Sequence, residues 1–144
     1  MNNFKFLEHT ADIKFQAFGK TLNECFKNSV LAMINSQYKG KIKNKLKKKI
    51  KIKGKDLENL LYNFLEEILF LVDTKGFLTS RAKVKISKDR KSLEAELIGD
   101  NIKNYKLSWD VKAITYNEMF VKIDEKKKIW TSQVVLDVWF SVIL

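Results

Sequence analysis

The feature that most constrains the fold is a wide apolar stripe between Asp56 and Gly76, DLENLLYNFLEEILFLVDTKG. Its apolar residues recur at helical spacing: Leu57, Leu60, Leu61, Phe64, Leu65, Ile68, Leu69 and Val72. Asp56 suits the N-cap of this helix, and Gly76 stands where helices often end in a left-handed residue. Because so wide an apolar face must be covered, we expect this helix to be the central one, packed on a β-sheet.

Two strands and a second helix are predicted at the start of the chain. Residues 4–6 and 13–17 alternate apolar with polar side chains, which indicates two short strands broken around His9 and Thr10. Residues 21–36, TLNECFKNSVLAMINS, then place their apolar positions at helical spacing. The chain therefore opens with a strand pair followed by an amphipathic helix.

The lysine-rich stretch KGKIKNKLKKKIKIKGK predicts a strand rather than a basic tail. Its apolar residues all fall on even positions: Ile42, Leu46, Ile50 and Ile52. This period of two gives the strand one buried face and one lysine-covered face. The lysines could contact RNA, or they could form a solvated edge that discourages aggregation. We prefer the solvated edge from the sequence alone.

The second half of the chain is mostly strands, which makes the predicted fold class α+β. Residues 82–87 and 92–99 form a hairpin, and residues 111–123 and 129–144 form another strand pair. We expect a mixed or antiparallel β-sheet with two main amphipathic helices, in a single domain spanning residues 1–144. The order of elements shows a weak internal echo, without a repeat of sequence identity.

Composition and charge favour a soluble protein that contacts anions. The chain is 45% hydrophobic and 31% charged, as in ordinary globular domains, and its formal net charge is +11. Cys25 is the one cysteine, so no intramolecular disulfide can form, and its place on an apolar helical face indicates a core residue. With no signal-peptide pattern and no spanning apolar segment, we expect a reduced, cytoplasmic protein without membrane contact.

Common catalytic motifs are absent from the sequence. It contains no GxxxxGK[ST], GxGxxG, CxxC or HExxH pattern. With one histidine and one cysteine, neither a zinc site nor a Ser–His–Asp or Cys–His constellation is supported. A conventional hydrolase is therefore not expected.

Three charged residues in unusual surroundings are the strongest candidates for a site. Asp12 begins a strand, Asp137 lies within the apolar run VVLDVWF, and Lys112 lies between Val111 and Ala113. If the last strand lies beside the second, the two carboxylates could converge and hold a hard cation such as calcium or magnesium. A structural ion pair with Lys112 is the alternative, and physics alone favours it.

Four pieces of the chain resemble the archease family, in the family's order. FLEHTADIKFQAFGKTLNECFKNSVLAM is similar to the family's opening, a His-Thr-Ala-Asp motif followed by a Gly-ended strand and an amphipathic helix. NFLEEILFLVDTKGFL is similar to the central helix, VKAITYNEM to a Val-Lys-Ala-Val-Thr-Tyr-His segment, and VVLDV to the closing motif. The match spans nearly the whole chain.

The resemblance implies an accessory protein of the RtcB-type RNA ligase, which joins RNA ends during tRNA splicing. Such proteins are implied to promote guanylylation and multiple turnover of the ligase, and to broaden its nucleotide use, without being enzymes themselves. The implied fold is a strand-helix-strand-strand module with a second such module inserted in it. Any contact with tRNA would be indirect, through the ligase.

The resemblance also implies a site. A divalent metal, calcium before magnesium or manganese, would be held by Asp12, by Asp137 and by a main-chain oxygen of Val138. Lys112 matches the family's functional lysine, so the implied ligase-activating residues are Asp12, Lys112 and Asp137. His9 and Thr10 would support the turn around Asp12.

The sequence departs from the family at three points and leaves other functions open. Asn117 replaces a histidine of the family, and the loop before Val111 is short and lacks the family's usual histidine. Six residues, WFSVIL, follow Val138, where the family generally ends and a terminal carboxylate joins the metal. The runner-up function is an RNA-binding or RNA-chaperone module that uses residues 43–53. A stand-alone metal-dependent enzyme is a third and less favoured hypothesis.

Overall fold

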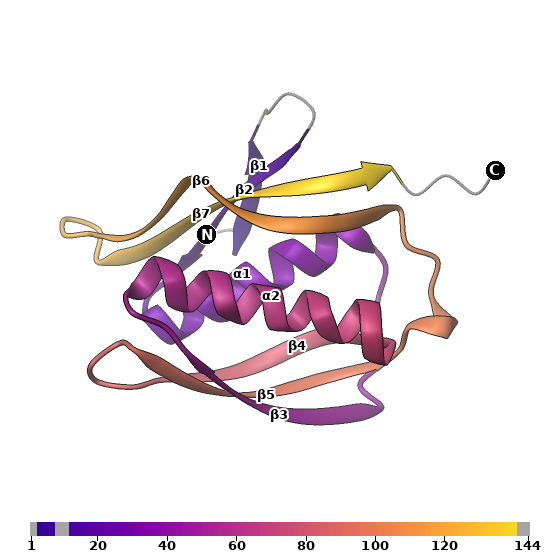
Figure 1. Ribbon diagram of the computed structural model, residues 1–144. Coiled ribbons are helices and arrows are strands. Elements are labelled where there is room, and N and C mark those ends of the chain that lie inside the picture. The colour runs from indigo at the N-terminus through magenta and orange to yellow at the C-terminus, as the bar shows by residue number, and fades with distance from the viewer. Residues whose placement is uncertain (1–2, 8–11, 141–144) are drawn as a thin grey trace.

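The structure is a computed structural model that describes residues 3–7 and 12–140, with Phe140 described by its backbone alone. Two sheets lie on opposite sides of a layer of two helices (Figure 1). The elements in chain order are β1 (Phe4–Leu7), β2 (Ile13–Gly19), α1 (Leu22–Gln37), β3 (Leu46–Lys53), α2 (Leu57–Lys75), β4 (Phe77–Ile86), β5 (Ser92–Asn101), a 3-10 turn (Ile102–Asn104), β6 (Trp109–Asp124) and β7 (Ile129–Phe140).

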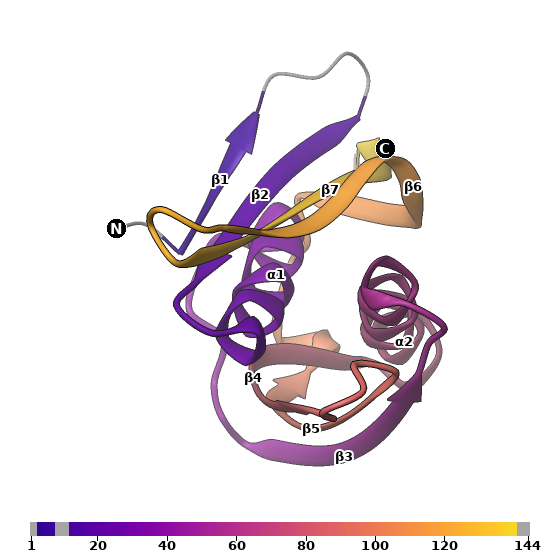
Figure 2. The same ribbon diagram turned by 90° about the vertical axis from the view of Figure 1, so that its left-hand side faces the viewer.

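The two sheets correspond to two nested modules. The four-stranded sheet has the order β1-β2-β7-β6, the three-stranded sheet has the order β3-β5-β4, and every pairing is antiparallel. The contiguous run β3-α2-β4-β5 interrupts the module formed by β2, α1, β6 and β7. The prediction of an α+β fold with an inserted strand-helix-strand-strand module is confirmed. Figure 2 shows the strands divided between two sheets, a division that alternation along the sequence could not reveal.

Helix α2 begins and ends where the sequence indicates. The side chain of Asp56 accepts a hydrogen bond from the backbone N–H of Asn59 at 2.8 Å, which satisfies one of the free donors of the first turn. At the other end Gly76 adopts φ 62°, the left-handed conformation that glycine tolerates best. Local chemistry therefore fixes both ends of the central helix.

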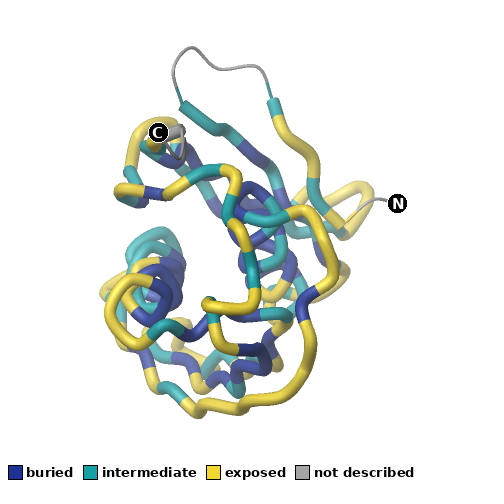
Figure 3. The backbone as a smooth tube through the Cα atoms, turned by 90° about the vertical axis from the view of Figure 1, so that its right-hand side faces the viewer, coloured by how far each residue is buried: buried dark blue, intermediate teal, exposed yellow. Residues whose placement is uncertain are grey.

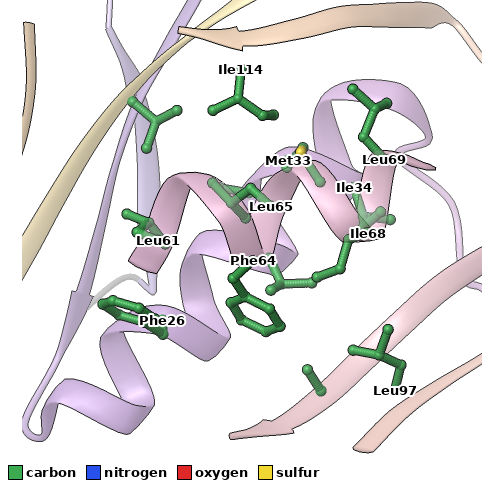
Figure 4. Close-up of a cluster of buried hydrophobic side chains, with 14 of the residues drawn as sticks. Phe26, Met33, Ile34, Leu61, Phe64, Leu65, Ile68, Leu69, Leu97 and Ile114 are labelled. Atoms are coloured by element: carbon green, nitrogen blue, oxygen red, sulfur yellow. The ribbon is translucent and has the colours of Figure 1, made fainter. Parts of the chain in front are cut away.

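A single buried cluster joins both helices to both sheets. Phe26 of α1 stacks on Phe64 of α2 with ring centroids 6.4 Å apart, and both rings are fully buried. Side chains from α1, α2, β5 and β6 gather in the region shown in Figure 4. Buried stretches of the chain lie on the helices and on the strands facing them, and exposed stretches lie at the periphery (Figure 3). Each fully buried Leu or Phe stabilises the fold by about 1.5–3 kcal/mol.

The lysine-rich strand is confirmed, but it is shorter than the alternation predicts. Strand β3 begins at Leu46, and Ile42 lies in the preceding segment, although it is still buried in the core. Ile50 and Ile52 face the helices as expected, whereas Leu46 is 44% exposed. Alternation identifies the face on which a residue lies, but burial also depends on which neighbours cover that face.

Cys25 is a core residue, as predicted. Its side chain is fully buried and donates to the carbonyl oxygen of Ala17 at 3.6 Å. Burial raises the pKa of its thiol to about 12, so it remains protonated and is not a nucleophile. Among the described residues, no helix is both long and apolar enough to cross a membrane.

Candidate functional site

The two candidate aspartates are each next in sequence to the last residue pair at one end of the β2–β7 ladder. Strand β2 pairs with β7, and Ile13 lies opposite Leu136. Asp12 directly precedes Ile13 and Asp137 directly follows Leu136, so the same register carried one residue further places the two aspartates opposite each other. Opposite side chains in an antiparallel pair have Cβ atoms about 4.5–5.5 Å apart. The strand pairing on which their convergence depends is therefore present.

Both carboxylates belong to the outer face of this sheet. Successive side chains of a strand point to opposite faces, and Phe15 and Val134 are buried against the helices. Asp137 is an odd number of residues from Val134 and therefore lies on the face turned away from the helices. Its side chain is 45% exposed, so its charge keeps much of its contact with water.

Lys112 reaches this face because β6 is irregular beside it. Val111 pairs with Val138 and Ala113 pairs with Asp137, which leaves Lys112 as an extra residue between them. Such a bulge bends the strand and redirects a side chain. The Nζ atom of Lys112 lies 3.8 Å from Oδ1 of Asp137, so the ion pair considered from the sequence is present. Between groups this exposed, an ion pair contributes only about 0–1 kcal/mol.

Trp139 is the residue of this site that the sequence did not reveal. Its ring centroid lies 3.4 Å from Nζ of Lys112, and its side chain is 58% exposed. Trp139 follows Asp137 by two residues, so both side chains lie on one face of β7 and bracket the ammonium group. The i, i+2 spacing was a usable signal, but the bulge that brings Lys112 between them was not visible in the sequence.

The other residues predicted for the site are Val138, His9 and Thr10. Val138 pairs with Val111, is half-buried, and points to the opposite face from Asp137. Only its main chain could therefore contribute to a site shared with Asp137. His9 and Thr10 lie outside the described residues.

The oxygen ligands that Asp12 and Asp137 would supply at this end of the sheet fit a hydrated hard cation. Two carboxylates on adjacent strands supply oxygen ligands of the kind that calcium and magnesium prefer, and water would have to complete the shell. Zinc would need nitrogen or sulfur ligands, and residues 3–7 and 12–140 contain no group of three or more His, Cys, Asp or Glu placed to hold a metal. The Lys112 ammonium group would compete with a cation for Asp137.

A hollow of about 250 Å³ borders Asp12. It lies between the β1–β2 pair, the end of α1 and the start of β6, and its lining residues are Phe6, Leu7, Asp12, Ile13, Lys14, Ser36, Lys39 and Trp109. Two lysines and one aspartate thus share a partly apolar depression. The tip therefore offers a partner a concave surface as well as exposed charges.

The segment TYN of β6 is held against helix α2. The ring of Tyr116 stacks on Tyr62 with centroids 4.3 Å apart, and its hydroxyl accepts a hydrogen bond from Nδ2 of Asn59 at 2.6 Å. The exposed Asn117 follows. This part of β6 is therefore positioned by packing on α2 as well as by pairing within the sheet.

A second irregularity of β6 follows directly. The register shifts between Thr115 and Phe120, and Glu118 has φ 54°. Nε2 of Gln133 donates to the carbonyl oxygen of Glu118 at 2.8 Å, and Nζ of Lys14 lies 3.2 Å from Oε1 of Glu118. Contacts from the neighbouring strand β7 and from β2, the strand beyond it, thus hold a backbone conformation that is unfavourable for a non-glycine residue.

The fold defines a small α+β protein built from two nested modules. Its candidate site, Asp12, Asp137 and Lys112, lies at one end of the larger sheet, and we call these residues the acidic tip. The family model described as "Archease protein family (MTH1598/TM1083)" matches residues 4–138. The chain belongs to the archease family.

Relatives in other organisms match over nearly their whole length. A protein archease of Pyrococcus furiosus is 37% identical over 143 residues, covering 96% of this chain and 100% of the relative. One of Sulfurisphaera tokodaii is 36% identical over 141 residues, covering 96% and 100%. The solution structure of Methanobacterium thermoautotrophicum protein 1598 is 33% identical, covers 95% of this chain and 99% of its own, and has a TM-score of 0.81.

Proposed function

We propose that this protein is an accessory protein of an RtcB-type RNA ligase, acting in the cytoplasm during tRNA splicing. In this proposal it promotes guanylylation and multiple turnover of the ligase and has no catalytic activity of its own. Membership of the archease family supports the accessory role. The activation of this particular ligase and the part played by the tip are the proposed steps.

One structural observation carries the proposal. Asp12 directly precedes β2, Asp137 lies in the neighbouring strand β7 with its Oδ1 3.8 Å from Nζ of Lys112, and none of these side chains belongs to the core. Carboxylates and an ammonium group held together at a partly exposed sheet end are available to a partner.

The residues of the tip suit a site at which phosphates react. Asp12, Asp137 and a main-chain oxygen of Val138 would hold a divalent metal, with calcium favoured over magnesium and manganese. Such an ion would supply charge neutralisation for phosphate groups in guanylyl transfer. Lys112, positioned by Asp137 and Trp139, would present its ammonium group to a phosphate oxygen of the ligase's nucleotide.

Guanylylation of the ligase, measured with and without this protein, is the direct test. Asp12→Ala and Asp137→Ala are each expected to remove most of the stimulation while the circular dichroism melting curves stay close to wild type. Glu125→Ala, which removes an exposed carboxylate from the β6–β7 turn at the opposite end of the same sheet, is the matched control and should stimulate normally. Full stimulation by both aspartate variants would refute the proposed role of the tip.

Metal binding can be tested without the ligase. Isothermal titration with calcium, magnesium and manganese is expected to show binding to the wild-type protein and a large loss of affinity in Asp137→Ala. Incubating the protein alone with RNA and GTP should give no product. Ligation or hydrolysis by the isolated protein would contradict the accessory role.

A further inference from the structure

The positive charge of the chain is concentrated in the inserted module. Residues 39–106 contain 19 of the 28 Lys and Arg residues but 9 of the 17 acidic residues, a formal net charge of +10. The rest of the chain carries +1. Because so uneven a distribution gives one side of the molecule a strong positive potential, the module's surface is a candidate for binding a polyanion.

The register of the three-stranded sheet gathers these charges on its outer face. Strand β3 contributes Lys47, Lys49, Lys51 and Lys53, all exposed. On the other side of β5, strand β4 contributes Arg81, Lys83 and Lys85, also exposed. We call these seven residues the basic face. Their alternate neighbours, such as Ile52 and Ala82, are buried against the helices.

Strand β5 separates the two columns of cations with a short acidic column. Glu96 lies opposite both Lys49 and Lys83, and Glu94 lies opposite both Lys51 and Lys85. Cations of one column recur about every 6.8 Å, and neighbouring strands are about 4.8 Å apart. The face is therefore a regular array of seven cations around two carboxylates.

Most of these cations have no carboxylate partner within the described part of the chain. Lys51 lies 3.7 Å from Glu94, and Lys83 lies 3.7 Å from Glu96. Both lysines are largely exposed, so salt and water weaken these pairs. The other five cations form no ion pair among residues 3–7 and 12–140, and an extended anion would relieve their mutual repulsion.

The chemistry of the basic face favours nucleic acid over protein or membrane. The exposed large hydrophobic residues of the described chain are Phe6, Leu46, Phe70, Tyr116 and Trp139. Of these only Leu46 belongs to this sheet, at the start of an edge strand and at an even position, on the side of Ile50 and Ile52. Protein interfaces usually need aromatic or aliphatic anchors, and membrane surfaces need apolar insertion. Regularly spaced lysines without such anchors match a phosphate backbone.

We propose that the basic face binds the phosphate backbone of RNA without sequence preference. The sequence suggested only residues 43–53, and the structure adds Arg81, Lys83 and Lys85 from β4. The face lies on the far side of the helix layer from the four-stranded sheet, so it is separate from the acidic tip and does not depend on the tip's function (Figures 1 and 2). Lysines on edge strands also hinder aggregation, but that role requires no RNA.

Fluorescence anisotropy with a labelled RNA hairpin, measured over a range of salt concentrations and without ligase, tests the proposal. The triple variant Lys47→Gln/Lys49→Gln/Lys53→Gln removes cations that have no ion-pair partner among the described residues. It is expected to weaken binding at least about tenfold and to reduce the salt slope by about 2–3, as for three lost phosphate contacts. The control Lys122→Gln/Lys126→Gln/Lys127→Gln removes the same charge from the other sheet and should lose no more than about twofold.

Three further results would decide the assignment. Equal losses in the two triple variants would show that net charge, not this face, governs binding, and no measurable binding by wild type would overturn the proposal outright. Competition by poly-glutamate or by phosphatidylserine vesicles as strong as that by unlabelled RNA would assign the face to anions in general. Thermal melts of both variants should match wild type, because the substituted side chains are exposed.

Substitution of the acidic column on β5 tests the proposal through an expected gain in RNA affinity. If phosphates contact the lysines on either side of β5, Glu94→Gln/Glu96→Gln removes repulsion and should strengthen RNA binding severalfold at low salt. The same double substitution should leave calcium binding and ligase stimulation unchanged, because the tip lies on the other sheet. Unchanged or weaker RNA binding would place the RNA outside this face.

Discussion

The two sheets cover the same pair of helices, but their outer faces are built differently. The three-stranded sheet keeps one register along the whole β3–β5 pair and repeats a lysine at every second position. In the four-stranded sheet, β6 is irregular twice, at Lys112 and around Glu118, and each irregularity redirects particular side chains. Regular pairing produces an array suited to a repetitive partner, whereas interrupted pairing places individual groups next to one another.

The largest expected effect tests whether the two sheets are stabilised as one unit. Phe64 is fully buried between the helices that both sheets share, so Phe64→Ala should lower the free energy of unfolding by about 3–5 kcal/mol. All three tryptophans lie in β6 and β7, so their fluorescence reports the four-stranded sheet. The urea transition measured by tryptophan fluorescence should occur at the same urea concentration as the loss of amide hydrogen-exchange protection in β3, β4 and β5. Separate transitions would show two independent units.

A second substitution should destabilise the three-stranded sheet more directly. A Cβ atom at Gly99 would lie 2.0 Å from the carbonyl oxygen of Leu78, where β4 shifts register beside β5. Gly99→Ala must therefore displace backbone and should lower the free energy of unfolding by about 1–3 kcal/mol, measured by urea denaturation. Ala95→Gly, on the same strand, removes a small buried side chain without creating a clash, and it indicates the ordinary cost of a change in β5.

Matched lysines should separate the chemistry of the two faces. Lys112→Gln and Lys51→Gln each break one exposed ion pair, so each should change the free energy of unfolding by less than about 1 kcal/mol. Only Lys112→Gln should increase calcium affinity, because it removes a competing cation from Asp137, and only it should reduce ligase stimulation. Identical calcium titrations for the two variants would show that Asp137 is not a ligand of the metal.

The smallest effect concerns pH and a carboxylate near the end of α2. Burial, and then the negative charge of Asp110, raise the pKa of Asp73 above its ordinary value. Its neutral form is therefore favoured in the folded state, and the stability it contributes at low pH is lost as the pH rises through the raised pKa. Asp73→Asn should raise the melting temperature at about pH 7 but not at about pH 3. A Glu125→Gln control should show no such difference.

Local features of the fold were predictable because their causes are local. The stripe and the caps of α2 depend on neighbouring residues, and both Asp56 and Gly76 act as the sequence indicates. The division into two sheets depends on which strand pairs with which across more than a hundred residues, as for Ile13 and Leu136. Such contacts are set by the packing of the whole chain, which alternation does not encode.

The candidate site was predictable in the same uneven way. Asp137 and Lys112 were predictable candidates because charges in apolar surroundings need a partner, and their side chains do lie within ion-pair distance. Asp12 was a candidate because of its place at the start of a strand beside polar residues. Trp139 was counted only as part of a segment after the closing motif, because its contact with Lys112 requires the bulge at Val111/Ala113. A backbone irregularity of one residue is not visible in a pattern of period two.

The nested connectivity also determines the order in which the two surfaces can exist. Strands β3, β4 and β5 come from one continuous stretch, so every residue of the basic face has been synthesised before β6 and β7. The tip needs Asp12 from one end of the chain and Asp137 from the other, and β2 must wait for β7. During synthesis the residues of the basic face are therefore complete before the last strand that the tip requires, so the tip can exist only on chains that have been synthesised through β7.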